Sequence, residues 1–283
     1  MNSNTTDHHH HGNGGRRRRR GPRRGQPHAH HKPAPAHASS AVPALEPIAC
    51  DAAPVAFTTL GLDARLLEGV RDLGYVETRP VQSAVIPLAL GGHDLIACAE
   101  TGTGKTAAFV VPTLQRLLHP DEAGAPALQP GAKSRVLVLA PTRELAVQIE
   151  DEIHGLAYHT SVTSAAVYGG VEMGPQERAL KAGVDIIVAT PGRLMDHMRQ
   201  QNADLSGIAL LVLDEADRMM DMGFWPDVRR IIEAIPTERQ TLLFSATMPN
   251  EVVRDALVIT RGAKYVQIGQ RSAPARTITH QVA

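Results

Sequence analysis

The chain has 283 residues, 43% apolar and 20% charged, which is typical of a globular protein with one large or two small domains. Two cysteines exclude a disulfide scaffold and a four-cysteine zinc site, and favour a reducing compartment. No apolar run approaches the roughly 20 residues of a membrane helix, and no apolar core follows the N-terminal arginines, so neither a membrane partner nor a secretory signal is expected. We expect a cytoplasmic protein, and the preference for Arg over Lys favours a bacterial source.

The net charge of zero conceals two segments of opposite charge. Residues 1–56 carry eight basic and three acidic side chains, whereas residues 57–283 carry 21 basic and 26 acidic ones. Residues 1–56 are rich in His, Arg, Pro and Ala and are expected to be disordered, because they cannot bury enough apolar surface. The arginines at 16–20 suggest affinity for nucleic acid or, equally, a solvated tail. The histidines at 8–11 would bind metal only weakly.

From residue 57 onward the pattern is that of a folded domain. Apolar residues between Leu62 and Leu73 follow helical spacing, with Asp63 as the cap. Strands are then expected at 95–99, 136–140, 164–168, 186–189, 210–213 and 242–244. Helices are expected at 105–118, 142–157, 176–181, 193–199 and 250–259, and a surface loop at 119–134. Strand–helix alternation with fully apolar strands predicts an α/β fold with a mostly parallel sheet covered by helices on both faces.

Residues 99–106, AETGTGKT, have the spacing of a phosphate-binding P-loop with Ala99 in place of its first glycine. Gly102 and Gly104 allow the backbone N–H groups to turn toward phosphates, and the helix expected from Lys105 adds its positive end. Lys105 is expected to neutralise the β- and γ-phosphates, and Thr106 to offer its hydroxyl to Mg²⁺. The alternative is a chance glycine-rich turn, which the strand before it and the helix after it argue against. Cys98, on that strand, is expected to be a core residue.

An acidic run, Asp214-Glu215-Ala216-Asp217, directly follows the apolar run at 210–213. The carboxyl end of a buried parallel strand is where open α/β sheets bind ligands. Asp214 would hold Mg²⁺, partly through water, and Glu215 would polarise the attacking water. The alternative is a helix start, which also favours acidic residues. A P-loop upstream favours the catalytic interpretation.

These two motifs, with four others in the same order, make the chain resemble a DEAD-box RNA helicase. The others are PTRELA at 141–146, GG at 169–170, TPGR at 190–193 and SAT at 245–247. Upstream, GYVETRPVQ at 74–82 is similar to the adenine-reading Q motif, which usually reads GY-x-x-PTPIQ, and Phe57 stands at the family's isolated upstream aromatic. Thr78 and Arg79 replace the Pro-Thr pair, so the hydroxyl usual before Pro80 is missing, whereas Pro80 and Gln82 are kept. The resemblance covers about 57–283.

The resemblance implies an ATP-dependent RNA helicase built from RecA-like domains, with ATP and Mg²⁺ as cofactors and RNA as partner. Gln82 would read the adenine, with Phe57 or Tyr75 packing nearby. Residues implied to bind nucleotide are Phe57, Tyr75, Gln82, Ala99, Thr101, Gly102, Thr103, Gly104, Lys105 and Thr106; catalysis would involve Lys105, Asp214 and Glu215, and Mg²⁺ would be held by Thr106 and Asp214. Asp217, Ser245 and Thr247 would couple the nucleotide state to RNA binding.

Contacts to the RNA backbone are implied for Thr142, Arg143, Gly169, Gly170, Thr190, Pro191, Gly192 and Arg193. Each has a plainer interpretation, since the arginines could be surface charges and 190–192 a turn at a helix start. Contacts to phosphate and ribose carry little sequence preference.

The domain organisation expected from the resemblance has three parts. Residues 1–56 form the basic tail, 57–275 form a RecA-like ATP-binding domain from the Q motif to the SAT motif, and 276–283 begin a linker. No second P-loop-type sheet and no His-Arg-x-Gly-Arg segment follows, so the second RecA-like domain is expected to be missing from this chain. A lone ATP- and RNA-binding module without unwinding activity is the alternative function. A P-loop ATPase acting on DNA or protein is a third, which the joint presence of PTRELA, TPGR and DEAD argues against.

Overall fold

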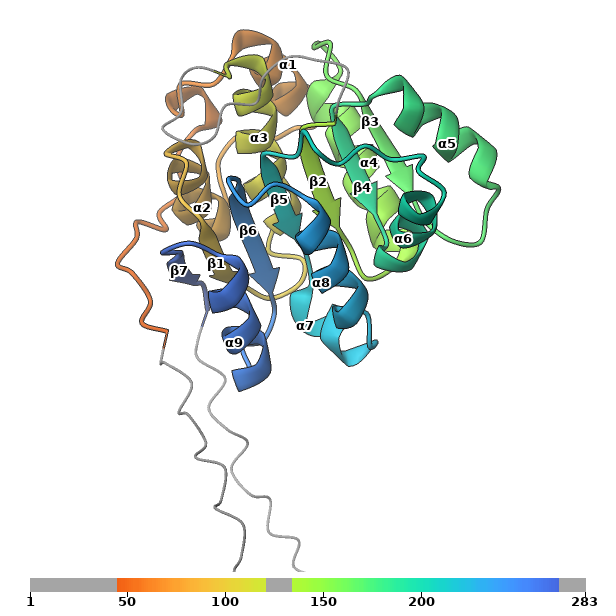
Figure 1. Cartoon of the computed structure of the whole chain (residues 1–283). Helices are drawn as coiled ribbons and strands as arrows, with labels where there is room; N and C mark the ends of the chain where they lie inside the picture. The colour runs from red at the N-terminus through yellow and green to blue at the C-terminus, as the bar shows by residue number, and fades with distance from the viewer. Residues whose placement is uncertain (1–44, 121–133, 270–283) are drawn as a thin grey trace, which may run out of the picture. The chain divides into compact units, whose positions relative to one another are not determined.

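A computed structural model describes residues 45–120 and 134–269, which lie within one compact unit (Figure 1). Seven strands form one sheet: β1 (Leu95–Cys98), β2 (Val136–Leu139), β3 (Ser164–Val167), β4 (Ile186–Ala189), β5 (Leu210–Leu213), β6 (Gln240–Ser245) and β7 (Lys264–Gln267). Their spatial order is β3-β4-β2-β5-β6-β1-β7, and every neighbouring pair is parallel. The predicted α/β fold with a parallel sheet is therefore confirmed.

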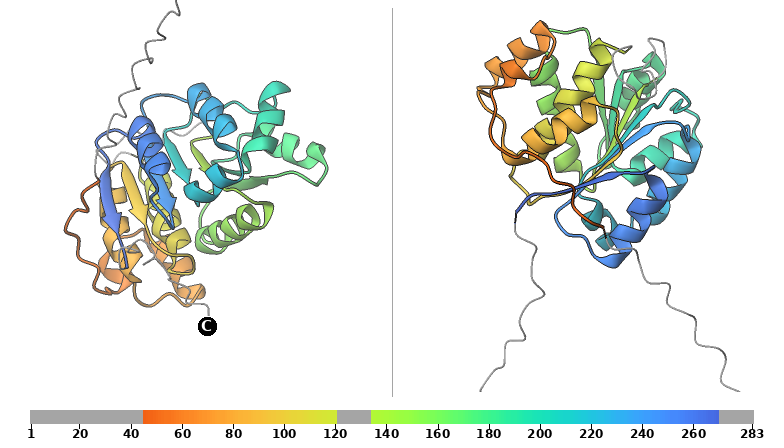
Figure 2. Two further views of the ribbon diagram at one scale, coloured as in Figure 1. Left: turned by 90° about the horizontal axis from the view of Figure 1, so that it is seen from below. Right: turned by 90° about the vertical axis from the view of Figure 1, so that its left-hand side faces the viewer.

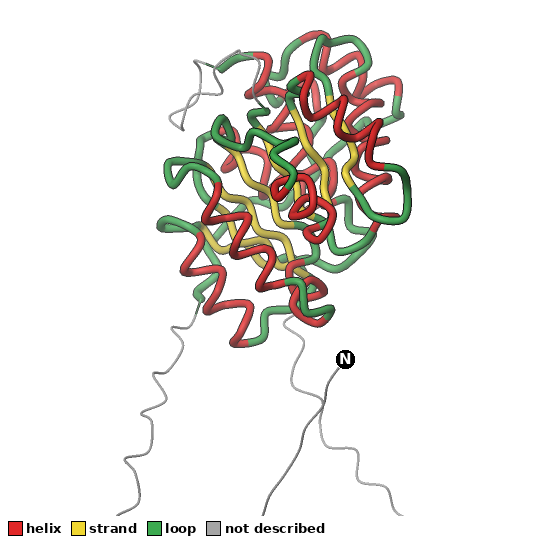
Figure 3. The backbone as a smooth tube through the Cα atoms, turned by 45° about the vertical axis from the view of Figure 1, so that its right-hand side comes forward, coloured by secondary structure: helices red, strands yellow, loops and turns green. Residues whose placement is uncertain are grey.

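Helices cover both faces of this sheet, as the right-hand view of Figure 2 and the tube in Figure 3 show. One layer contains α1 (Ala64–Asp72), α2 (Pro80–Leu90), α3 (Lys105–Leu118) and α4 (Arg143–Ala157), preceded by a short 3₁₀ turn at Phe57–Thr59. The other contains α5 (Met173–Ala182), α6 (Pro191–Arg199), α7 (Ala216–Asp221), α8 (Trp225–Ala234) and α9 (Asn250–Ile259).

Alternation along each strand divides the apolar core between the two faces. On β2, Val136 and Val138 pack under α1–α4, whereas Leu137 and Leu139 pack under the second layer. This is the period of two that strand geometry imposes, and it explains why strands buried on both sides are continuously apolar. The two layers and the sheet thus form one rigid platform for the loops at its edge.

The segment before the domain differs from our sequence-based expectation. Residues 1–44 lie outside the described part, but residues 45–56 are not part of a disordered tail: 45–50 pack on the core beside β7, and 55–56 bond to residues 77–78. The Ile48 N–H donates to the Tyr265 carbonyl of β7 at 2.9 Å, and Leu45, Ile48 and Cys50 pack on the core. These apolar side chains supply the buried surface that the preceding sequence lacks. The 121–133 part of the expected loop and the expected linker lie outside the described residues.

The parallel sheet brings the carboxyl ends of all its strands to one edge. The loops that follow β1, β2, β3, β4, β5 and β6 contain the motifs AETGTGKT, PTRELA, GG, TPGR, DEAD and SAT, respectively. Strand β6 lies between β1 and β5, so the phosphate loop and the acidic run are two strand spacings apart, about 10 Å.

Candidate nucleotide and RNA site

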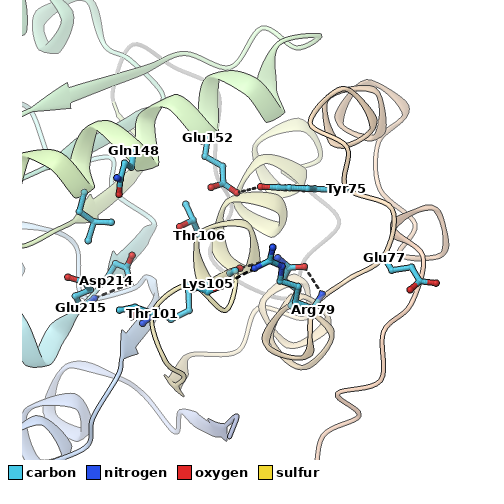
Figure 4. Close-up of a pocket in the computed structure, with 14 residues that line it drawn as sticks. Tyr75, Glu77, Arg79, Thr101, Lys105, Thr106, Gln148, Glu152, Asp214 and Glu215 are labelled. Carbon is cyan, nitrogen blue, oxygen red and sulfur yellow. Dashed lines mark hydrogen bonds between the residues drawn. The ribbon is translucent and has the colours of Figure 1, made fainter.

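A cavity of about 390 Å³ opens at this edge, between the phosphate loop, the start of α2 and the end of β5 (Figure 4). It is lined by Tyr75, Glu77, Arg79, Gln82, Thr101, Gly102, Gly104, Lys105, Thr106, Leu145, Gln148, Glu152, Asp214 and Glu215. The structure therefore brings together the P-loop, the Q-motif segment and the acidic run. Such a cavity, with convergent polar groups, is large enough for a small-molecule ligand.

The backbone of the phosphate loop adopts the conformation that its glycines were expected to permit. Gly102 and Gly104 have φ values of +77° and +94°, in the left-handed region, and α3 begins at Lys105. Lys105 is 6% exposed, and its ammonium donates to the Ala99 carbonyl at 2.9 Å. Ala99 does not line the cavity. Thr103 does not line it either, and its hydroxyl donates to the Glu100 carbonyl within the loop at 2.7 Å.

Two carboxylates face the phosphate loop from the end of β5. Asp214 is 3% exposed, and burial raises its pKa to about 6, although the charge of Lys105 opposes the rise. Glu215 has φ 52° and ψ 53°, a left-handed conformation that is uncommon outside glycine and often marks a functional site. Arg218 donates to the Glu215 carboxylate at 3.0 Å and so fixes its direction.

Hard oxygen ligands suited to Mg²⁺ line the cavity. The Thr106 hydroxyl, from the first turn of α3, and the Asp214 carboxylate, directly after β5, both line it. Within residues 45–120 and 134–269, no cluster of three His, Cys, Asp or Glu side chains could hold a metal. One hydroxyl and one carboxylate fit Mg²⁺, which commonly binds to one or two protein oxygens and takes its remaining ligands from phosphates and water.

The Q-motif segment forms the other wall of the cavity. The Gln82 amide oxygen accepts from the Arg79 N–H at 2.8 Å, and its amide nitrogen donates to the Gly104 carbonyl at 3.1 Å. These bonds leave one N–H and one lone pair of the amide for a ligand. The Tyr75 hydroxyl donates to Glu152 at 2.9 Å; burial raises the pKa of Tyr75 to about 12 and also raises the pKa of Glu152.

Phe57, like Ala99 and Thr103, was predicted to bind nucleotide but does not line the cavity. Its ring is 2% exposed, belongs to the core, and stacks on Tyr75 at a centroid distance of 6.0 Å. Phe57 therefore supports Tyr75 from behind instead of facing a ligand.

A buried hydroxyl anchors the Q-motif segment one position upstream of the place where the family has it. The Thr78 hydroxyl lies 2.6 Å from the Ser83 hydroxyl and accepts from the Val55 N–H at 2.9 Å. Residues 55–57 also bond to 76–78 through backbone groups. Thr78 thus supplies an anchor where the sequence showed only a missing hydroxyl.

The three predicted coupling residues form one hydrogen-bonded group. The Asp217 carboxylate accepts from the Thr247 N–H and hydroxyl at 2.9 and 2.8 Å. The Asp217 N–H donates to the Ser245 hydroxyl at 3.3 Å, which donates to the Thr247 carbonyl at 2.7 Å. The Ser245 carbonyl also accepts from the Ala99 N–H at 3.0 Å, so Ser245 bonds to both the phosphate-loop strand and the acidic run.

The predicted RNA contacts gather at the ends of β2, β3 and β4. The Arg193 guanidinium donates twice to the Val171 carbonyl, at 3.0 and 3.1 Å, next to Gly169 and Gly170. A Cβ on Gly170 would lie 3.5 Å from Arg143, whose side chain is half exposed. The remaining members are Thr142, which caps α4 through a 3.3 Å bond from Leu145, and Thr190, Pro191 and Gly192 at the start of α6. Arg143, Gly169 and Gly170 are exposed at this surface and Arg193 is half-buried, whereas the predicted contact Pro191 is buried.

Several cavity residues were missed by sequence reasoning. Leu145, Gln148 and Glu152 line it from one face of α4, at helical spacing, and Glu77 and Arg79 line it from the Q-motif segment. The expected helix over 142–157 contained the spacing signal, but only the packing of α4 beside α3 shows which face meets the cavity.

Comparison with known proteins agrees with this geometry. A sequence profile of the DEAD/DEAH box helicase family matches residues 79–256. The chain belongs to the DEAD/DEAH box helicase family. It is 45% identical over 217 residues to DEAD-box ATP-dependent RNA helicase 30 of Arabidopsis thaliana, covering 77% of this chain and 36% of that protein. It is 44% identical over 198 residues to ATP-dependent RNA helicase CshA of Listeria monocytogenes, covering 70% and 36%, respectively.

A solved DEAD-box structure has the same fold. The crystal structure of a DEAD box protein from Methanococcus jannaschii matches with a TM-score of 0.67 and 36% identity, over 75% of this chain and 55% of that chain. The chain spans about two fifths of the length of the curated relatives it matches. None of the helices in the described ranges is long and apolar enough to cross a membrane.

Proposed function

We propose that this DEAD-box chain binds ATP with Mg²⁺ and supplies the hydrolytic residues of an RNA-stimulated ATPase that remodels RNA duplexes. The observation that carries the proposal is the single cavity shared by Lys105, Thr106, Asp214 and Glu215. Its relatives include ATP-dependent RNA helicases, which supports the same activity. The two cysteines, Cys50 and Cys98, are free thiols, which supports a cytoplasmic location.

The protein groups have distinct tasks in this proposal. Lys105 and the N–H groups at the start of α3 neutralise the outer phosphates, and the remaining donor and acceptor of Gln82 match the adenine edge. Thr106 and Asp214 would hold Mg²⁺, which would supply positive charge that offsets the charge of the phosphates. Glu215 orients a water molecule and accepts its proton at the carboxylate, held in place by Arg218 at 3.0 Å.

RNA would lie across the exposed surface formed by Arg143, Gly170 and Arg193. Open backbone beside two guanidinium groups suits phosphate and ribose, so little base preference is expected. The resemblance to DEAD-box helicases assigns Ser245 and Thr247 to the connection between this surface and the nucleotide. The bonds of Ser245 to Asp217 and Ala99, and of Thr247 to Asp217, support that role.

Two variants test the nucleotide site. Lys105→Ala is expected to abolish binding of Mg²⁺–ATP, because it removes the buried cation at the phosphate loop. Glu215→Gln should retain ATP binding and lose hydrolysis, because an amide cannot accept the proton of water. Binding is followed by titration with a fluorescent ATP analogue and hydrolysis by phosphate release, with Lys181→Ala, an exposed lysine on α5, as the control. Equal loss of binding in the two site variants would refute the assigned roles.

The RNA surface has its own measurement. Arg193→Gln should lower the slope of log K against log salt for single-stranded RNA by about 0.7 units, the contribution of one phosphate contact. An unchanged slope would remove Arg193 from the RNA surface without affecting the nucleotide assignment.

A further inference from the structure

Arg79 departs from the family's Q motif, which has Thr at this position, and the structure places its side chain in the nucleotide cavity. One guanidinium nitrogen donates to the Gly102 carbonyl at 2.9 Å. The Arg79 stem crosses the phosphate loop, because its Cδ atom would lie 2.9 Å from a Cβ on Gly104. Figure 4 shows the side chain between Tyr75 and Lys105.

The backbone around Arg79 gives the side chain this direction. Arg79 precedes Pro80, the first residue of α2, and is extended with φ −83° and ψ 161°, the conformation favoured before proline. Its N–H donates to the Gln82 amide oxygen, while the Gln82 amide nitrogen bonds to Gly104. Arginine has no acceptor with which to cap the helix, so its side chain is free to extend over the loop.

Among the described residues, no ion pair neutralises the charge of Arg79. In the described ranges, none of the carboxylates forms a salt bridge with its guanidinium, whose one hydrogen bond is to a neutral carbonyl. The charge nevertheless acts within the cavity, since it opposes the rise that burial causes in the pKa of Tyr75 and in that of Glu152. A guanidinium has five N–H donors, so most remain available to an anion in the cavity.

We propose that Arg79 is a second phosphate-binding cation of the nucleotide site and contacts the phosphate next to the ribose. This inference rests on the proposed function. Arg79 lies between the side of the cavity assigned to adenine, with Tyr75 and Gln82, and the phosphate loop, whose Lys105 faces the outer phosphates. A guanidinium between these two groups reaches the α-phosphate, which AMP, ADP and ATP share, and charge-assisted bonds to phosphate are the strong ones.

The test measures the dissociation constants of adenosine, AMP, ADP and ATP by NMR titration of the 283-residue chain. Arg79→Gln should weaken AMP, ADP and ATP by a similar factor, about tenfold, the value expected for loss of one charged hydrogen bond. Adenosine affinity should not change, and Arg79→Lys should retain part of the affinity. Arg254→Gln, an exposed arginine on α9, is the matched control.

The possible results separate this inference from the proposed function. If Arg79→Gln weakens the binding of ATP alone, Arg79 lies at the outer phosphates. If it weakens the binding of adenosine equally, Arg79 has only a structural role, and if no affinity changes, Arg79 is not part of the site. Each of these three results overturns the inference. Lys105→Ala is measured in parallel and should weaken ATP more than AMP. If Lys105→Ala leaves ATP affinity unchanged, the proposed function itself fails, and the inference with it.

Discussion

The bond between Asp217 and Thr247 offers a quantitative test of the coupling group. Asp217→Ala removes a carboxylate that accepts from the Thr247 N–H, the Thr247 hydroxyl and the Arg218 N–H, at 2.8 to 3.0 Å. A hydrogen bond to a charged group contributes about 1.5–3 kcal/mol when buried. Asp217 is half-buried and Thr247 is exposed, so bonds to water replace part of this contribution in the variant. We therefore expect the free energy of unfolding to fall by about 2 kcal/mol.

A double-mutant cycle isolates the interaction. Thr247→Val removes the hydroxyl bond alone and should cost about 1 kcal/mol. Combined with Asp217→Ala, the two changes should be non-additive by about 1 kcal/mol, measured by urea unfolding. Asp221→Ala, at the exposed end of the same helix, should change stability by less than about 0.5 kcal/mol. Additive effects in the cycle would show that the two side chains do not interact in solution.

The same bond predicts a pH dependence. Burial raises the pKa of Asp217, but the hydrogen bonds that its carboxylate accepts from Thr247 and Arg218 oppose this rise and leave the pKa below its usual range. A carboxylate with a lowered pKa stabilises the fold above the unfolded value, about pH 4, and this contribution is lost as the pH falls further. The difference between the wild-type chain and Asp217→Ala should therefore narrow below about pH 4.

Two further predictions concern the sheet edge and the phosphate loop. Burial raises the pKa of Glu150, so its charged form is disfavoured in the fold. Glutamine does not titrate and retains an acceptor for the Ala166 N–H, a bond of 2.8 Å in the wild-type chain. As the pH rises from 4 to 7, the stability of Glu150→Gln should therefore increase relative to that of the wild-type chain, by less than about 1 kcal/mol in urea unfolding. Gly104→Ala should abolish ATP binding, because its Cβ would lie 2.6 Å from Gln82 and the φ of this position is +94°. The control is Gly61→Ala, at a position with φ +68° and no atom within 4 Å of the added Cβ. It should bind ATP normally and lose only about 1 kcal/mol of stability. Normal ATP titration of Gly104→Ala would contradict this reasoning.

The elements that could be predicted from sequence are those with an unambiguous period and clear ends. Strands β4 and β5 and helices α3 and α9 have the predicted bounds, because their apolar residues are bordered by glycine, proline or charge. Helix α6 begins two residues earlier than predicted because Pro191 is favoured at the first helical position. Helix α5 is likewise longer than predicted, spanning Met173–Ala182.

The elements that were missed lack such signals. Strand β7 reads KYVQ and lies at the sheet edge, where polar ends are tolerated, so its four residues show no buried-strand pattern. Helix α2 contains Pro87 and is apolar on nearly all sides, which conceals a helical period. Helix α8 begins at Trp225-Pro226, directly after another short helix.

The candidate site shows the same division between local and long-range information. The phosphate loop and the acidic run are each a continuous segment whose chemistry follows from residue type and position, so both could be recognised before the fold was known. Arg79 and Glu152 lie 73 positions apart and line the same cavity only because α2, α3 and α4 pack together. Sequence spacing contains no information on such a convergence.

The strand order gives a physical reason for the proposed link between the nucleotide site and the RNA surface. Strand β6 separates the strand before Lys105 from the strand before Asp214, so a ligand held by both residues spans the end of β6. Ser245, at that end, is fully buried and bonds to Ala99 on one side and Asp217 on the other. A closely packed strand end cannot absorb a shift in one neighbour without moving the other. We therefore expect a change at the phosphates to reach Thr247 through Ser245 and Asp217, and the double-mutant cycle measures the interaction energy between Asp217 and Thr247.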